Sequence, residues 1–315
     1  MIKKCNTLNW VHTLAVLLVF FVYIEQPSLP KGIHKIANQQ PDEKGLDEAR
    51  WYQSELGLIV APSTSSLSVV ADIYREMVAA QKLFNDHFGT LAGQGIIYDV
   101  KFSGYLKPEK LESARWILPW DSSIPLGKSA RKPLRHEISH MLFVVYFWPN
   151  TRKFQYGGDA PDWLDEIAAI SAEDEKITDS RRYSFREAYE ENRTLSLSHF
   201  FAMEHPLYAS KELKNLIRRA QSGGSDAKVL KLSAEQAKAL KLDGKLFYAQ
   251  ARAILDFLKV NSGSEHVLQD ITLALKGGQT MDGWLASLND KDQQTLGRNV
   301  LEMEKKFLQW IVIHL

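Results

Sequence analysis

The distribution of apolar and polar residues along the first part of the chain predicts a small sheet crossed by one helix. Leu56 to Ala61 is a short apolar run bounded by turn-forming residues, which suits a strand. From Leu67 to Phe88 the apolar residues recur at mostly helical spacing, and a glycine ends the pattern. Ile96 to Phe102 and Arg115 to Trp120 are rich in β-forming residues. These segments predict a small mixed β-sheet before residue 125.

The second part of the chain has a helical pattern, so we expect an α+β fold that becomes mostly α-helical toward the C-terminus. Pro133 fits the first turn of a helix through about Phe147, and Pro161 opens another that runs to about Ala172. The charged stretch from Glu173 to Asn192 suggests an exposed segment or lid. After a loop at residues 222–225, helices are expected near Ser233–Leu240, Phe247–Val260, Ser264–Leu275, Met281–Leu288 and Asp292–Ile313.

The N-terminal residues have the pattern of an export signal, in which two lysines precede an apolar stretch. Cys5 to Ile24 carries no formal charge over 20 residues, which is about enough for one membrane-spanning helix. Val22 to Pro27 offers no pair of small residues for cleavage. We therefore expect residues 1–24 to be an uncleaved signal anchor, with a cleaved signal peptide and a buried helix as the alternatives.

The position of the basic residues predicts that the N-terminus is cytoplasmic and that the bulk of the protein lies outside the cytoplasm. Residues 25–50 are polar and rich in proline and are expected to form a linker, followed by a main domain at 51–220 and a helical C-terminal subdomain at 221–315. Cys5 is the only cysteine, so the exported part can form no disulfide and offers no thiolate to a metal.

The overall charge excludes one class of function. Lys and Arg number 39 and Asp and Glu number 38, which leaves a formal net charge of +1. A nucleic-acid-binding protein usually has a basic excess or a basic stripe, and this sequence has neither. The function must therefore be inferred from particular residues.

Residues 136–140 have the sequence His-Glu-Ile-Ser-His. On a helix, positions i and i+4 lie one above the other, so His136 and His140 can share a metal ion while Glu137 lies beside them. With 9 histidines in 315 residues, such a match is expected by chance in on the order of one in a hundred chains of this composition. A catalytic zinc ion needs three protein ligands and one open position, so a third ligand must come from elsewhere.

The third ligand can be sought downstream. A metzincin needs a glycine and a third histidine soon after the pair, and the continuation from Met141 excludes that class. Glu166 lies 26 residues after His140, within Pro-Asp-Trp-Leu-Asp-Glu-Ile-Ala-Ala. A second helix antiparallel to the first can direct Glu166 back to the metal. Asp165 is next to it but points about 100° away around a helix, so both cannot be primary ligands.

Together the two segments resemble the peptidase MA-like gluzincins, whose pattern is His-Glu-x-x-His followed by a Trp-Leu-x-Glu-Gly-x-Ala helix. The resemblance implies a zincin-like catalytic domain in which His136, His140 and Glu166 bind one zinc ion and Glu137 is the general base. Ile167 stands where the family usually has glycine, and this departure could alter helix packing or narrow the cleft.

Weaker similarity to the same family extends to about residues 115–260. Tyr248 begins a helix where some gluzincins have an oxyanion-donating tyrosine, so it is a candidate catalytic residue, and a half-buried helix aromatic is the alternative. Arg252 is expected to be an exposed helix residue. His199 and His205 match no metal-site spacing and are expected to be surface or internally hydrogen-bonded histidines.

The expected function is zinc-dependent hydrolysis of a peptide or protein substrate, with the catalytic domain tethered to the membrane by the N-terminal helix. The resemblance also implies that Arg115 to Trp120 is an edge strand to which an extended peptide can add, and an ordinary edge strand without that role is the alternative. One alternative is a catalytically inactive zincin-like module that binds a peptide or partner at the membrane. Another is a membrane-tethered scaffold without metal. Zinc is inferred from the ligand types, and other divalent ions can occupy such a site in vitro.

Overall fold

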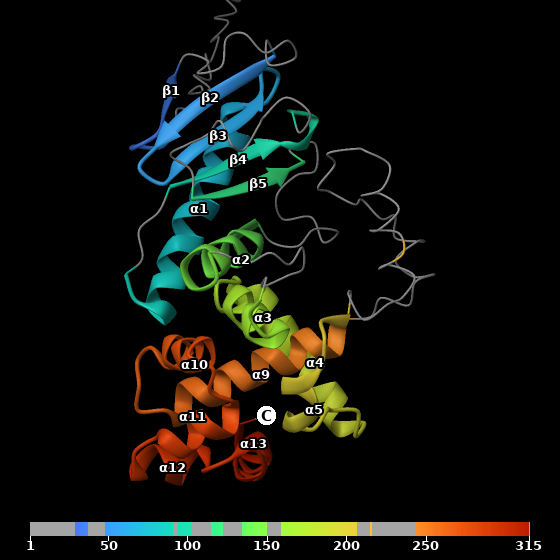
Figure 1. Cartoon of the computed structure of the whole chain (residues 1–315). Coiled ribbons are helices and arrows are strands. Elements are labelled where there is room, and N and C mark those ends of the chain that lie inside the picture. Colours follow the sequence, from blue (N-terminus) through green and yellow to red (C-terminus); the bar gives the residue numbers. More distant parts are fainter. Residues whose placement is uncertain are drawn as a thin grey trace, which may run out of the picture.

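Helices dominate the α+β fold, with one sheet at an end of the molecule. The structure is a computed structural model, and it describes residues 29–36, 48–90, 94–102, 115–121, 134–149, 159–206, 215 and 244–314. In Figure 1 the sheet lies at the top, the middle helices lie below it and the C-terminal helices form the opposite end. The expected α+β class is confirmed.

Among the described residues, five strands form a sheet in the order β1-β2-β3-β4-β5. β1 with β2 and β2 with β3 are antiparallel pairs, whereas β3 with β4 and β4 with β5 are parallel pairs. The predicted mixed sheet is therefore confirmed. β5 lies at one edge, as predicted. The strands are β1 (His34–Ile36), β2 (Ala49–Ser54), β3 (Gly57–Pro62), β4 (Gly95–Asp99) and β5 (Trp116–Trp120).

β1 was not expected, because it lies within residues 25–50, which have the composition of a linker. Its residues pair with β2, so 34–36 belong to the sheet. A strand of three residues leaves almost no periodic signal in the sequence, which explains why the pattern did not predict it.

β3 is buried on both faces and explains why its sequence is a continuous apolar run. Ile59 belongs to the main hydrophobic core, which also includes residues of the helices. Leu58 and Val60 point to the other face and join a smaller cluster with Trp51. Successive side chains of β3 therefore pack into two different cores, because the side chains of a strand point alternately to its two faces.

The crossover between the parallel strands β3 and β4 is helix α1 (Leu67–Phe88). The hydroxyl of Ser66 accepts a hydrogen bond from the backbone N–H of Val69 at the start of α1, and Gly89 ends it with a φ of 77°. After β4 the chain makes the short 3-10 turn η1 (Val100–Phe102), so the expected strand ends earlier than its composition suggested.

Within the described part of the chain, the helices that carry the candidate site pack against one another. α2 (Leu134–Phe147) packs against α1 and α3 (Asp162–Ser171), and α9 (Lys245–Asn261) packs against α3 and α4 (Glu175–Glu190). The expectation of a lid after residue 173 is wrong, because Phe185 of α4 is fully buried in the main core. The charged residues of α4 cover one side of a helix whose other side is packed.

The C-terminal part consists of short helices packed near α9 (Figure 1). The single helix expected over Asp292–Ile313 is wrong: it is divided into two helices at Gly297, whose φ of 95° is incompatible with a continuous right-handed helix. Helix α5 (Leu197–Ala202) follows α4 in the chain. The helices after α9 are α10 (Val267–Lys276), α11 (Met281–Ser287), α12 (Asp290–Leu296) and α13 (Val300–His314).

Several predictions from the sequence lie outside the described residues. These are the signal anchor or signal peptide at 1–24, the loop at 222–225, the helix at 233–240 and the domain boundary between 220 and 221. Within the described part of the chain, none of the helices combines the length and the apolar character needed to cross a lipid bilayer.

Candidate metal centre

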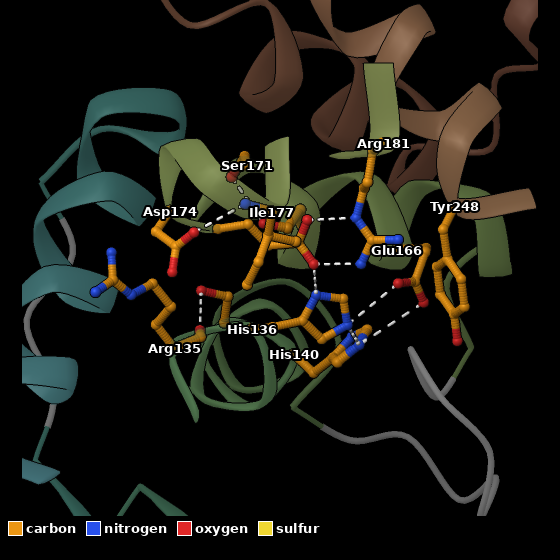
Figure 2. A network of polar contacts seen from close by, with 12 residues as sticks. Arg135, His136, His140, Glu166, Ser171, Asp174, Ile177, Arg181 and Tyr248 are labelled. Atoms are coloured by element: carbon orange, nitrogen blue, oxygen red, sulfur yellow. Dashed lines mark hydrogen bonds and ion pairs between the residues drawn. The ribbon is translucent and has the colours of Figure 1, made fainter. Parts of the chain in front are cut away.

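α2 brings its two histidines together, as the four-residue spacing predicts. The Nε2 atoms of His136 and His140 lie 3.2 Å apart, and each residue is only 1% exposed. The two ring planes are inclined at 83°, so the rings are not stacked, and their Nε2 atoms point to a common position. Figure 2 shows both imidazoles on the same side of the helix.

Glu166 approaches the pair from α3, the helix that follows α2. Its Oε1 lies 3.2 Å from Nε2 of His136, and its Oε2 lies 3.8 Å from Nε2 of His140. A ligand atom from each of the three residues lies within 4.8 Å of the other two. All three are buried, so this group can hold a metal ion.

Each histidine also has a carboxylate at its other ring nitrogen. Nδ1 of His136 lies 2.9 Å from Oε1 of Glu173, and Nδ1 of His140 lies 2.8 Å from Oδ2 of Asp165. The first contact is a hydrogen bond, whereas the second is short but not aligned as one. Arg181 of α4 donates from Nε and Nη2 to the two oxygens of Glu173. Such carboxylates fix the orientation and tautomer of metal-binding histidines.

The positions of these carboxylates determine where the imidazole protons lie. A carboxylate offers only lone pairs, so it favours a proton on the Nδ1 atom that faces it. Neutral His136 and His140 then present two unprotonated Nε2 atoms to each other at 3.2 Å and to the Glu166 carboxylate. Three lone-pair donors facing one another in a buried site repel each other, and a cation among them removes that repulsion.

The charges around the imidazoles favour the same conclusion. The contacting carboxylates of Asp165, Glu166 and Glu173 are buried, and the guanidinium of Arg181 offsets only one of these three negative charges. Burial disfavours charge on His136, but the Glu166 and Glu173 carboxylates outweigh burial and raise the pKa of His136 to about 9. Burial likewise opposes charge on Glu166, yet the charge of His136 holds the pKa of Glu166 well below its usual range.

The donor spacing also fits a metal ion. Bonds of 2.0–2.1 Å in a tetrahedral arrangement separate the donors by roughly 3.3–3.5 Å. The two Nε2 atoms lie 3.2 Å apart, close to that value, and Glu166 has one oxygen 3.2 Å from the first nitrogen and its other oxygen 3.8 Å from the second. Both Glu166 oxygens are buried and have no well-aligned hydrogen-bond donor among the described residues, as expected for a carboxylate whose partner is a cation.

Tyr248 lies at the same site, near the start of α9. It is half-buried, and its ring centroid is 6.4 Å from that of His136. The guanidinium carbon of Arg181 lies 4.8 Å from the centroid of the Tyr248 ring, within the range of a cation–π contact. Figure 2 shows Tyr248 beside Glu166, so Tyr248 lies next to the candidate metal ligands although it is far from them in the sequence.

The structure also places a histidine that sequence reasoning set aside. His205 is fully buried, and its Nε2 lies 3.3 Å from Oε2 of Glu166 and 3.2 Å from the hydroxyl oxygen of Tyr248. It is an internally hydrogen-bonded histidine, as one of the two expectations had it, but one that contacts the site. His199 is exposed on α5 and plays no part in it.

Three further residues singled out in the sequence, Ile167, Arg252 and Glu137, lie on the helices around the site. Arg252 was expected to be exposed, and this is wrong, because it is 7% exposed and forms an ion pair with Asp256 one turn along α9. Ile167 is fully buried in the main core, so it fills the space between helices. Glu137 follows His136 on α2 and is half-buried.

Similarity to known proteins does not classify the chain. No protein-family model matches it, and no curated protein and no solved structure is significantly similar to it. Conclusions about function therefore rest on the residues of the site.

Proposed function

We propose that this protein is a zinc-dependent peptidase of the gluzincin kind, with His136, His140 and Glu166 as the three ligands of one zinc ion in a zincin-like domain. The observation that carries this proposal is the pair of imidazoles whose Nδ1 atoms face Glu173 and Asp165 and whose Nε2 atoms converge with Glu166. Three nitrogen and oxygen ligands with a remaining open position are typical of catalytic zinc.

The ligands support zinc over the hard divalent cations. Mg²⁺ and Ca²⁺ prefer cages of oxygen ligands, whereas two neutral imidazoles and one carboxylate suit zinc. When bound, zinc lowers the pKa of a coordinated water toward neutrality and polarises the scissile carbonyl. The sequence His-Glu-x-x-His then supplies the remaining catalytic group from the same helix.

Glu137 has the role of general base in this proposal. It takes a proton from the attacking water and later delivers it to the leaving amine. The hydroxyl of Tyr248 donates to the oxygen of the carbonyl as it gains negative charge. With a zinc ion on their Nε2 atoms, His136 and His140 would be neutral and would carry their remaining proton on Nδ1, which faces Glu173 in one case and Asp165 in the other.

A peptide is the proposed substrate because the sheet offers an edge close to α2. β5 is an edge strand among the described strands and packs against α2. An extended peptide can pair with the backbone of such an edge, which positions a peptide bond with little demand on its side chains. The proposed site of action is outside the cytoplasm on a membrane anchor, and residues 1–24 are the basis of that prediction.

The test compares the full-length, zinc-loaded protein with its Glu137→Gln variant on a mixed peptide library. Loss of a general base is expected to lower turnover about 10²–10⁴-fold while zinc content stays the same. Glu187→Gln, at a carboxylate on α4 that is 3.5 Å from Lys245, is a matched control and should retain activity. Equal turnover by Glu137→Gln and the parent protein would refute the assignment. Zinc binding without any turnover would favour the inactive peptide-binding module.

A further inference from the structure

Strand β5 contains a proline at the sheet edge where a peptide is proposed to add. Pro119 is the fourth residue of β5 (Trp116–Trp120), and a proline has no backbone N–H to donate. The missing donor weakens the sheet if it faces β4, whereas it limits what can bind if it faces the open edge. The hydrogen bonds of β4 distinguish these two orientations.

Alternate residues of β4 bond to the strands on its two sides. The N–H of Gly95 donates to the carbonyl of Leu56, next to β3, at 3.0 Å, so Gly95 faces β3. The pairing of β4 with β5 continues without a bulge through all of their residues. Because the backbone groups of successive strand residues point to opposite sides, Ile96 and Tyr98 face β5.

The same alternation gives the direction of each residue of β5. Ile96 is paired with Ile117, so its N–H and C=O bond to the residues on either side of Ile117. Those residues are Trp116 and Leu118, which therefore face β4. Ile117 and Pro119 face away from β4, which is the orientation to which proline is confined in an edge strand.

The open edge of β5 thus has more acceptors than donors. Among the described residues, no strand pairs with β5 on the side that Ile117 and Pro119 face. Both residues present a carbonyl there, but only Ile117 presents an N–H. Arg115, just before the strand, adds no donor because its N–H bonds to the carbonyl of Gln94 at 2.9 Å. In Figure 1 this edge is the side of the sheet that lies toward α2.

An extended peptide on this edge can form three backbone hydrogen bonds with Ile117 and Pro119. In either chain direction it donates two N–H groups, from residues two positions apart, and accepts one hydrogen bond from Ile117. The peptide carbonyl that would accept from residue 119 receives no hydrogen bond from β5. Recognition at this edge therefore depends more on the N–H groups of the peptide than on its carbonyls.

Protection against aggregation is the main competing role for Pro119, because a proline on an edge strand hinders pairing between copies of a protein. Charged side chains are another common protection, and β5 has none. Ile117, in the middle of the strand, keeps both backbone groups on the outer side. The edge is therefore restricted by Pro119 but not closed.

We infer that Pro119 determines specificity by limiting the β5 edge to one donor, so that it selects an extended peptide with two backbone N–H groups two residues apart. The inference rests on the proposed peptide substrate and states which backbone groups of that substrate are read. A substrate with proline or an N-alkylated residue at either of these two positions is excluded.

The first test measures binding without turnover. The probe is a fluorescein-labelled octapeptide selected from a mixed library for binding to the full-length, zinc-loaded Glu137→Gln protein. Hydrogen exchange with mass spectrometry follows residues 116–120, where bound peptide should slow exchange of the Ile117 amide. Adding Pro119→Ala should raise the number of protected amides by one. No protection in β5, the same number in both proteins, or no octapeptide that binds would overturn the inference.

The second test replaces single amides of the octapeptide by esters, each of which removes one N–H without adding bulk. Two ester positions, two residues apart, should each weaken binding about 2- to 10-fold. Pro119→Ala should bind the unmodified octapeptide about 2- to 10-fold more tightly, because it gains one neutral hydrogen bond. Pro30→Ala is the matched control: this half-buried proline precedes β1, the strand at the other end of the sheet order, and should not alter affinity.

The outcomes separate this inference from its competitor and from the proposed function. Unchanged affinity in Pro119→Ala together with increased self-association would assign Pro119 to edge protection and overturn the inference. Binding with the expected pattern of esters, but without hydrolysis by the parent protein, would refute the peptidase function and support the inference.

Discussion

Glu173→Gln tests whether the site depends on the carboxylates behind its histidines. Glu173 is 6% exposed, accepts the hydrogen bond from Nδ1 of His136 at 2.9 Å and forms an ion pair with Arg181. Glutamine has nearly the same shape but no charge, so the substitution weakens the hold on the imidazole without opening a cavity. We expect zinc to bind more weakly because the Nδ1 proton is no longer held by an anion.

The size of the effect follows from the bond that is weakened. A hydrogen bond to a charged group contributes about 1.5–3 kcal/mol, against about 0.5–1.5 kcal/mol for a neutral one. The difference of roughly 1–2 kcal/mol corresponds to a loss of about 5- to 30-fold in affinity, since 1.4 kcal/mol is a factor of ten. That range overlaps the loss of about 10–100-fold found when partners behind metal ligands are removed.

Competition with a chromophoric chelator measures the zinc dissociation constant directly, and urea unfolding of the metal-free protein shows whether the variant is still folded. Glu187→Gln removes a half-buried carboxylate from the neighbouring helix α4 and should leave the affinity unchanged. Zinc affinity within twofold of the parent protein, in a variant with unaltered unfolding, would refute the role assigned to Glu173.

Two further predictions concern stability away from the ligands. Burial and the charges of Lys259 and Arg252 lower the pKa of His87 to about 4, so the unfolded chain binds a proton that the folded protein excludes, and stability should fall as pH falls from 6.5 to 4 by up to about 3 kcal/mol. Urea unfolding at pH 7 and 4.5 should show a smaller pH dependence in His87→Gln, and equal dependence would contradict this. Ile167→Ala should destabilise the protein by about 2–5 kcal/mol in thermal or urea unfolding, because Ile167 is fully buried. A cost below 1 kcal/mol would mean that the helices close the cavity.

Local patterns predicted the parts of the site that lie on one helix or on two successive helices. The spacing of His136 and His140 and the proline before α3 are signals contained in a few consecutive residues. The return of α3 toward α2 was predicted from the need for a third ligand, and the two helices pack together. These features follow from helical geometry, which depends little on the rest of the fold.

The residues that sequence reasoning missed are those whose roles depend on distant segments. Glu173 and Arg181 lie in a charged stretch that is typical of a solvated surface. Glu173 lies in the turn between α3 and α4 and Arg181 lies on α4, so the packing of these helices brings both side chains inward. His205 has no regular spacing from the other histidines, and its position depends on its contacts with Asp162 and Phe247. Such tertiary contacts have no periodic signature in the sequence.

α3 contains both residues that local patterns predicted and residues whose roles depend on distant segments, because its ten residues contact several other parts of the chain. Asp162 holds the loop of His205, Asp165 faces His140, and Glu166 faces the converged nitrogens. α3 fulfils these three roles while it packs against both α2 and α9, and Ala168 and Ala169 of this helix are fully buried. A larger residue at either alanine would push a neighbouring helix away and separate the donors. We therefore expect Ala168 and Ala169 to be as necessary for the arrangement of His136, His140 and Glu166 as the packing of the helices that carry them.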